Sequence, residues 1–301
     1  MNWKHKAFAQ KMFSGTPYGE SLNYLAQRWV TKSLPSPDAV VLEEAAIAAK
    51  HLDAFFRYGR KEIDKANLYE FGVGWELGIP LYFYCAGLDQ QTLVDIRKLL
   101  RLELLNETVE KFRRLNDRLK LVRTPETFRN KDVTSLLKAK CGITYLAPCD
   151  ARNAGLAAES FDLITSTNTM EHIPPKDLSL ILQECYRLLK PDGVVSFKID
   201  YQDHYSYFDP NISAYNFLCY SEKAWVCYNS SLHYQNRLRH RDYLELMTRA
   251  GFMVLEDSHK EEESDINLLR TLPLDHSFQT CYEPRELAIR CSHLVAGKRQ
   301  A

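Results

Sequence analysis

Glycines and polar residues follow several short apolar runs of this sequence, at places where a ligand could bind. The first run ends in Glu70, followed by Phe71, Gly72, Val73 and Gly74. Glycines at a turn between a strand and a helix let a ligand approach the backbone closely. The pattern is not a nicotinamide-cofactor fingerprint, because G-x-G-x-x-G would need a glycine where Leu77 stands. The other interpretation of these glycines is a tight turn without a ligand.

Three further runs end in groups that either bind ligands or cap helices. Asp95 follows the second run, and an acid there can accept both hydroxyls of a ribose or cap the next helix. Asp150 follows the third run, where taken alone it is more often a turn or cap residue. Asn168 and His172 follow the fourth run. A lone histidine at that place is more often structural than functional.

Groups that can accept a proton are densest after the run 194–200. An imidazole with a pKa near neutrality is the best-matched general base. We therefore hypothesise that His204 is a catalytic base, oriented by Asp200 or Asp203, with His172 as the second choice. The alternative is that His204 packs against or caps a loop.

The elements that must position these residues alternate between strands and helices. Strands are expected at 67–71, 91–96, 143–149, 161–166, 194–200, 251–256 and 287–296. Helices are expected at 75–86, 97–116, 131–140, 178–189 and 239–250. This alternation predicts an α/β fold with a parallel, doubly wound sheet. Such a sheet binds ligands outside the carboxyl ends of its strands, where the residues above stand.

Two other parts of the chain frame this sheet. Residues 1–65 carry helical periodicity and are expected to form an N-terminal extension to a catalytic domain spanning 66–301. They could close one side of the site or form a homodimer contact. Residues 201–236 are an aromatic-rich insertion. It is either a substrate lid, with Arg237 and Arg239 pairing with an anionic group, or a small hydrophobic core.

Composition excludes several classes of protein. The 301 residues hold 39 Lys and Arg against 39 Asp and Glu, so the net charge is zero. This argues against a nucleic-acid or anionic-membrane binder. No apolar stretch reaches the ~20 residues of a membrane span, and no secretory signal is evident. The eight cysteines form no CxxC pair, which fits reduced thiols in a cytoplasmic protein.

The pieces together resemble class I S-adenosylmethionine (SAM)-dependent methyltransferases over about 67–256. The resemblance is carried by acid-x-Gly-x-Gly, the acids after the second and third strands, "FDLITSTNTMEHIP" and "YRLLKPDGVV". It implies a Rossmann-like sheet of seven mostly parallel strands with helices on both faces, and SAM as cofactor with S-adenosylhomocysteine as product. "EFGVGWELGIP" also looks like the first motif of methyltransferases from bacterial surface-polysaccharide and related loci.

The resemblance also implies cofactor contacts, carried over residue by residue. They are Gly72 and Gly74 under the methionine part, Glu70 at its amino group, Asp95 at the ribose, Asp150 and Ala151 at the adenine, and Ser166 and Asn168 on the floor near the sulfonium. The sequence departs from the family at Glu76, where many members have a third glycine.

These observations favour methylation of a hydroxyl on a small molecule or glycan. No metal is expected, because Ser166, Thr167 and Asn168 stand where metal-dependent O-methyltransferases need carboxylates. Nucleic acid is not expected as a partner, because "STNTMEHIPP" is not a base-flipping motif. The alternatives are a nicotinamide-dependent oxidoreductase and a non-catalytic SAM-binding or scaffold protein.

Overall fold

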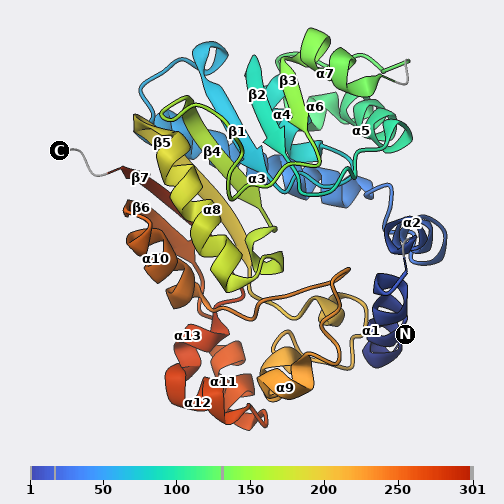
Figure 1. The fold of residues 1–301 in the computed structure, drawn as a ribbon, viewed down its shortest axis with the longest axis vertical. Coiled ribbons are helices and arrows are strands. Elements are labelled where there is room, and N and C mark those ends of the chain that lie inside the picture. The colour runs from blue at the N-terminus through green and yellow to red at the C-terminus, as the bar shows by residue number, and fades with distance from the viewer. Residues whose placement is uncertain (1, 17, 130–131, 299–301) are drawn as a thin grey trace.

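A seven-stranded sheet forms the centre of the protein (Figure 1). The computed structural model describes residues 2–16, 18–129 and 132–298. The strand order is β3-β2-β1-β4-β5-β7-β6, and β7 runs antiparallel to both of its neighbours while the other pairs are parallel. The strands are β1 (Asn67–Phe71), β2 (Gln90–Val94), β3 (Ile143–Leu146), β4 (Phe161–Thr167), β5 (Leu189–Asp200), β6 (Phe252–His259) and β7 (Cys291–Lys298). This confirms the predicted α/β fold.

Helices precede the sheet, connect its strands and fill the segment after β5. The α-helices are α1 (Trp3–Ser14), α2 (Gly19–Leu25), α3 (Asp38–Tyr58), α4 (Gly78–Cys85), α5 (Leu102–Arg114), α6 (Asn116–Leu119), α7 (Val133–Cys141), α8 (Pro175–Leu188), α9 (Glu222–Trp225), α10 (His240–Arg249), α11 (Glu263–Thr271), α12 (His276–Cys281) and α13 (Pro284–Ala288). Shorter helical turns are η1 (Ala26–Val30), η2 (Ile63–Lys65), η3 (Met170–His172), η4 (His204–Tyr207) and η5 (Asn216–Cys219). Among the helices of the described residues, none is both long and apolar enough to cross a membrane.

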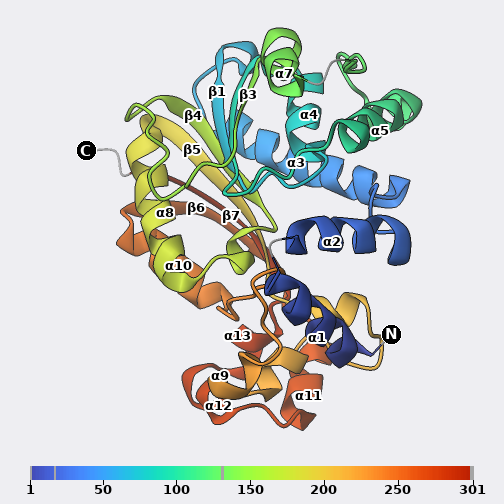
Figure 2. The ribbon, with the colours of Figure 1, turned by 45° about the vertical axis from the view of Figure 1, so that its right-hand side comes forward.

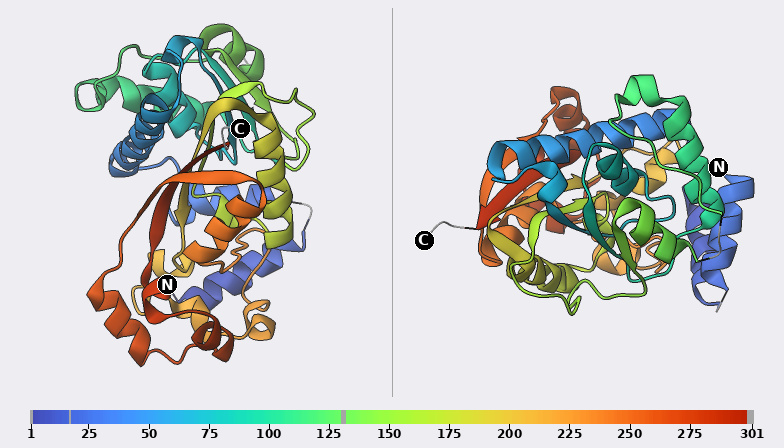
Figure 3. Two further views of the ribbon diagram at one scale, coloured as in Figure 1. Left: turned by 90° about the vertical axis from the view of Figure 1, so that its left-hand side faces the viewer. Right: turned by 90° about the horizontal axis from the view of Figure 1, so that it is seen from above.

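Both faces of the sheet are covered by helices. Alternate side chains of a strand point to opposite faces, so Leu68 packs with α3, α4 and α5, while Tyr69 packs with α8 and α10. The left view of Figure 3 shows α3 and α8 on opposite sides of the sheet. This doubly covered sheet holds the carboxyl ends of β1, β2, β4 and β5 along one edge.

Beyond this edge lies a second, smaller core. It joins α1 to the segment after β5 and to α11, α12 and α13, with Trp3, Tyr215 and Trp225 buried at its centre (Figure 1). Helix α3 belongs instead to the main core. Of the expected N-terminal extension 1–65, only the part before α3 therefore lies outside the sheet domain, and the boundary at residue 65 stays a prediction.

Several expected element bounds were wrong for local reasons. Helix α4 begins at Gly78 rather than at 75, because Leu77 takes a left-handed conformation with φ of +53°. Residues 97–101 are not helical, and α5 begins at Leu102. Residues 284–288 form α13, so β7 begins at Cys291 rather than at 287. Residues 190–193, which separate the expected helix 178–189 from the expected strand 194–200, lie within β5.

Candidate functional site

The loop after β1 has a conformation that glycine favours. Gly72 has φ of +76°, and a Cβ there would collide with the side chain of Thr169. Gly74 has φ of +69°, and a Cβ there would meet no atom of the described residues within 4 Å. The loop is thus pressed against the segment after β4 at Gly72. At Gly74 it is open, so a ligand can approach the backbone.

Two carboxylates flank this loop. Glu70 is 2% exposed, and its Oε2 has no hydrogen-bond partner in the described part of the chain. Burial raises the pKa of Glu70 to about 8. At the end of β2, Asp95 accepts the N–H of Gly74 at 3.3 Å and that of Arg97 at 3.0 Å. Burial raises the pKa of Asp95, although both of these N–H groups oppose the shift.

These features fit the cofactor that the resemblance implies. A buried, unpaired carboxylate at Glu70 suits an amino group, and the carboxylate of Asp95 stands beside the open glycine where a ribose would bind. Glu70, Gly72, Gly74 and Asp95 therefore come together as expected, at the carboxyl ends of two adjacent strands.

Asp150 follows β3 and is bound by a neighbouring arginine. Arg152 donates from Nη2 to Asp150 Oδ2 at 2.6 Å and from Nη1 to Asp177 Oδ1 at 2.7 Å. The hydrogen bond from Arg152 lowers the pKa of Asp150. The adenine contacts expected of Asp150 and the part-buried Ala151 stay predictions, and Asp150 would share its carboxylate with Arg152.

The two expected floor residues have different surroundings. Ser166 is fully buried and donates from its hydroxyl to the carbonyl of Phe71 at 3.1 Å. Ser166 therefore supports the glycine loop, and its place on the floor near the sulfonium stays a prediction. Asn168 is exposed at the end of β4, with φ of +47°, and its N–H donates to Lys198 O at 2.8 Å. Its side chain remains available to a ligand.

Glu76 holds a segment of the N-terminal chain. Its carboxylate accepts the backbone N–H of Ser36 at 3.0 and 3.1 Å and also the hydroxyl of Ser36. Lys111 donates to the carbonyl of Ser36 at 2.7 Å. The departure from the family pattern therefore has a structural use, since Glu76 ties the start of α3 to the loop after β1.

Helix α2 covers the glycine loop. Tyr24 stacks on Trp75 with ring centroids 5.3 Å apart, and Arg101 lies over the ring of Tyr24 at 5.0 Å. Glu20 forms an ion pair with Arg97, two residues after Asp95. Figure 2 shows α2 lying beside α3 near the ends of the strands. These contacts are consistent with the expectation that N-terminal helices close one side of the site.

The histidines singled out in the sequence meet beyond β4 and β5. The rings of His172 and His204 are 4.8 Å apart, and His233 lies 6.1 Å from His204. His204 Nε2 lies 3.3 Å from Asp200 Oδ2. His172 Nδ1 lies 2.7 Å from the carbonyl of Tyr234. Since a carbonyl only accepts, this nitrogen carries the hydrogen, and Nε2 of His172 keeps its lone pair.

The pKa values of the two central imidazoles, His172 and His204, are shifted in opposite directions. Burial opposes a charge on His204, but the neighbouring Asp200 and Glu171 outweigh burial and raise the pKa of His204. Burial and the adjacent His204 lower the pKa of His172 to about 4. Burial also acts on Asp200, but His204 and the hydroxyl of Tyr207 outweigh it and lower its pKa to about 2. The pKa of His204 is therefore raised while that of the adjacent His172 is lowered.

Asp203 does not orient His204. It is fully buried, where its Oδ1 accepts the N–H of Tyr205 at 2.9 Å and its Oδ2 accepts the side chain of Asn216 at 2.8 Å. Asp203 thus caps η4, and Asp200 is the carboxylate beside His204. Both oxygens of Asp203 are thus used within the loop, and its expected catalytic role stays a prediction.

Much of the aromatic segment 201–236 is a hydrophobic core. Tyr205, Tyr215, Phe217 and Trp225 are each at most 1% exposed. Their rings are therefore not free to cover a substrate. This supports the core interpretation for these four residues.

The guanidinium groups of Arg237 and Arg239 are used within the protein, whereas the lid interpretation expected them to pair with an anionic group of the substrate. Arg239 is fully buried, and its Nη1 donates to the carbonyl of Tyr201 at 2.6 Å. Arg237 donates to the carbonyl of Phe217 at 2.9 Å and pairs with Glu222. Both guanidinium groups hold the segment together.

Sequence reasoning passed over two contributors to this site. Glu171, within the quoted "MEH", is 2% exposed, and neither carboxylate oxygen has a hydrogen-bond partner among the described residues. Burial raises the pKa of Glu171 to about 8. The position of Glu171 directly before His172 could have indicated its role. No sequence feature indicates that Tyr24 stacks on Trp75, because this contact depends on how α2 packs against the sheet domain.

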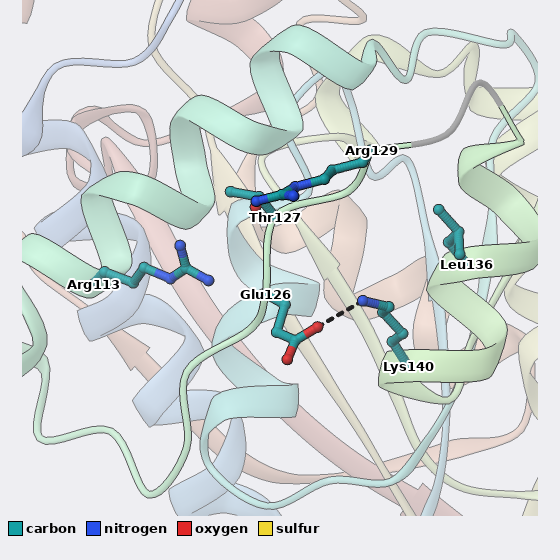
Figure 4. Close-up of a pocket in the computed structure, with 6 residues that line it drawn as sticks. All are labelled: Arg113, Glu126, Thr127, Arg129, Leu136 and Lys140. Atoms are coloured by element: carbon teal, nitrogen blue, oxygen red, sulfur yellow. Dashed lines mark hydrogen bonds and ion pairs between the residues drawn. The ribbon is translucent and has the colours of Figure 1, made fainter.

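A pocket of about 700 Å³ lies elsewhere, between α5 and α7 (Figure 4). Its lining includes Arg113, Arg129 and Lys140, and Lys140 pairs with Glu126 at 2.6 Å. Lys140 stands just before β3 begins, so the pocket lies toward the amino ends of the strands. Ligands of such sheets bind at the opposite edge, so the candidate site is the one built from the loops after β1, β2, β4 and β5.

Comparisons with known proteins agree with the geometry. Residues 97–197 match the family described as "Methyltransferase domain". No curated protein matches the chain. Among solved structures it is similar to a SAM-dependent methyltransferase from Methanosarcina mazei, at 15% identity, a TM-score of 0.45, and coverage of 82% of this chain and 97% of that one.

Two further structures are similar at comparable levels. One is a complex from Haloferax volcanii that contains the Trm112 methyltransferase activator. The identity is 17% and the TM-score is 0.46, and the match covers 93% of this chain and 96% of that one. The other is the CurJ carbon methyltransferase, at 11% identity and a TM-score of 0.46. There the match covers 85% of this chain, but this chain spans only 54% of that one.

The family match runs from the residues after β2 through β3 and β4 into β5. The strand order 3-2-1-4-5-7-6 with an antiparallel β7 is typical of class I methyltransferases. The glycine loop and the acids at Glu70 and Asp95 stand where that fold binds its cofactor. Residues 97–197 therefore carry a methyltransferase domain, and this match together with the fold implies SAM as the cofactor.

Proposed function

We propose that this enzyme methylates a hydroxyl group of a small molecule or glycan. The observation that carries the proposal is the cluster of His172, His204 and Asp200 at the carboxyl ends of β4 and β5. A hydroxyl must lose its proton when its oxygen is methylated, and a general base assists that loss. Acceptors that need no base would leave such a cluster without a use.

We assign the acceptance of the proton to His172 rather than to His204, the sequence's first choice. His172 Nε2 keeps its lone pair, because Nδ1 donates to Tyr234 O. Its pKa of about 4 makes it a weak base. A weak base suffices here, since the hydroxyl becomes strongly acidic as its oxygen gains a methyl group. His204, beside Asp200 at 3.3 Å, orients the cluster.

The cofactor side has a separate task. SAM, when bound, supplies an activated methyl group on a sulfonium. Glu70 holds the amino group and Asp95 the ribose, so the glycine loop positions the donor. The protein contributes chiefly by aligning the acceptor oxygen with that donor and by excluding water.

The supporting features favour a small acceptor in the cytoplasm. The chain has no net charge, which does not favour a polyanion such as nucleic acid or an anionic membrane surface. Helix α2 and the segment after β5 enclose the two sides of the site. The likeness of the first motif to enzymes of surface-polysaccharide loci makes hydroxylated sugars the first acceptors to test. A homodimer contact through the N-terminal helices is part of the same proposal.

The test is an acceptor screen by mass spectrometry with labelled SAM. We expect an O-methylated product, and His172→Ala should lower kcat by about 10²- to 10⁴-fold while calorimetry shows unchanged S-adenosylhomocysteine binding. His276→Ala, far from the cluster in α12, is the matched control and should keep the wild-type rate. A methylated nitrogen or carbon in the product, or a wild-type rate for His172→Ala, would refute the proposal.

A further inference from the structure

Three potential metal ligands meet beside the proposed acceptor position. One ligand atom from each of Glu171, His172 and His204 lies within 4.8 Å of the others. We propose that these three residues bind a divalent cation of the first transition series, such as Zn²⁺ or Co²⁺. This departs from the expectation of no metal, which considered only the last residues of β4.

The three side chains are near enough to converge on one cation. Zn–N and Zn–O distances are about 2.1 Å, so two ligand atoms of a tetrahedral site are about 3.4 Å apart. A pair at the 4.8 Å limit would have to close by roughly 1.4 Å through side-chain rotation. The hydrogen bond from His172 Nδ1 to Tyr234 O fixes that ring with Nε2 free, the arrangement usual for a ligand histidine.

Buried polar atoms without hydrogen-bond partners indicate that a ligand can bind here. Both oxygens of Glu171 are buried without a hydrogen bond to any described residue, and the side chain is 2% exposed. His204 is 9% exposed, and its Nε2 lies within ion-pair distance of Asp200 without forming a hydrogen bond to the described residues. Buried groups of this kind are costly unless something binds them, and a cation would satisfy both.

A second cluster shows the contrast. Among the described residues, the other group with metal-ligand spacing is His240, Asp257 and His259. Asp257 accepts from His240 Nε2 at 2.9 Å and from His259 Nδ1 at 2.8 Å, so its carboxylate is already satisfied. Asp257 and His259 are also open to solvent. This second cluster needs no cation and serves as the control.

The donor set selects the kind of cation. Two imidazole nitrogens and one carboxylate suit Zn²⁺, Co²⁺, Mn²⁺ or Fe²⁺ and leave positions open. Mg²⁺ and Ca²⁺ prefer sites made of oxygen ligands. The catalytic consequence rests on the proposed function, whereas the binding itself does not. A cation bound here would lower the pKa of an acceptor hydroxyl and so replace the proton acceptance assigned above to His172, whose Nε2 would then be a ligand; the proton would pass to water.

The experiment uses tag-free full-length protein that is stripped with a chelator and titrated with Co²⁺. We expect visible absorption bands of a nitrogen- and oxygen-bound Co²⁺ at one site per chain, and competition by Zn²⁺. Glu171→Gln should weaken binding by more than about 100-fold, beyond the roughly 10- to 100-fold loss caused by removing an outer partner. Asp257→Asn should leave the spectrum and the stoichiometry unchanged.

Three results would overturn the site. They are no Co²⁺ bands in the wild type, unchanged bands in Glu171→Gln, and equal loss in Glu171→Gln and Asp257→Asn. Calorimetry with S-adenosylhomocysteine shows that each variant is folded. The identity of the methylated atom is read separately by mass spectrometry, so a wrong acceptor class leaves the cation result intact.

Discussion

Glu44 is a part-buried carboxylate near the glycine loop that the catalytic proposal does not use. It lies in α3, where its side chain packs against Gly78 so closely that a Cβ at Gly78 would collide with it. Burial and the nearby charge of Glu76 raise the pKa of Glu44 to about 7. At neutral pH the fold therefore contains an acid that resists ionisation.

This acid predicts how stability depends on pH. The raised pKa means that the folded state favours protonated Glu44. The contribution of this group to the free energy of unfolding is therefore fully present below about pH 4.5 and is lost as pH rises through about 7. The shift from 4.5 to about 7 corresponds to at most about 3.5 kcal/mol, at about 1.4 kcal/mol per pKa unit. Glu44→Gln should raise Tm at about pH 8 and leave it unchanged at about pH 4, by differential scanning calorimetry.

The neighbouring Glu43 provides the control for this prediction. Glu43 is exposed on the same helix, so Glu43→Gln removes the same charge without relieving a buried one. An equal Tm gain in both variants at about pH 8 would assign the effect to net charge and contradict the prediction.

At the scale of elements, we expect the cover formed by α2 over the glycine loop to slow the release of the cofactor. Tyr24 on α2 stacks on Trp75, and Tyr24 also donates from its hydroxyl to Glu103 at 3.0 Å. An aromatic pair of this kind contributes about 0.5–1.5 kcal/mol beyond its buried area. The cover is therefore held by contacts of moderate strength, which suits a segment that must open.

Removing the stacked ring should speed cofactor release. Tyr24→Ala is expected to raise the dissociation rate of SAM by about three- to tenfold, the equivalent of the lost pair. Stopped-flow fluorescence of Trp75 would measure it. Trp29→Ala removes a ring that is 70% exposed in the following turn and should not change the rate. Similar rates for both variants would show that α2 is not a cover.

The sequence allowed the order of the elements to be predicted, but not how the N-terminal helices dock. The glycine turn, Asp95 and the "FDLI" strand carry local patterns, so β1, β2 and β4 could be placed within a few residues. Ser166 differs, because its hydroxyl turns beneath the loop toward Phe71, and no local pattern shows that direction. The same is true of Glu76, whose partner Ser36 lies 40 residues earlier.

At the scale of the whole molecule, the protein has two cores that share few residues. The sheet core holds the cofactor loop, whereas the second core joins Trp3 of α1 to Tyr205 and Trp225 after β5. The side chain of Trp3 is 4% exposed, and the backbone N–H of Trp3 donates to Asp209 Oδ2 at 3.0 Å. The acceptor side thus depends on a contact made by the first helix.

Loosening that contact should affect one half of the enzyme. Trp3→Ala removes a large buried ring, and such changes cost about 3–5 kcal/mol. Hydrogen exchange followed by mass spectrometry should show faster exchange in 203–236 and unchanged protection in β1 and β2, with S-adenosylhomocysteine still bound. Phe8→Ala, on the same helix but 68% exposed, should change neither region. Uniformly faster exchange in Trp3→Ala would argue for one cooperative unit.

The N-terminal segment touches both halves, with Tyr24 on the cofactor loop and Gln10 at 3.3 Å from the hydroxyl of Tyr205, beside the histidine cluster. An acceptor bound against this segment would hold it closed over the cofactor. The two ligands should then exchange in a fixed sequence, with SAM entering first and S-adenosylhomocysteine leaving last. In steady-state kinetics, S-adenosylhomocysteine would compete with SAM and be non-competitive toward the acceptor.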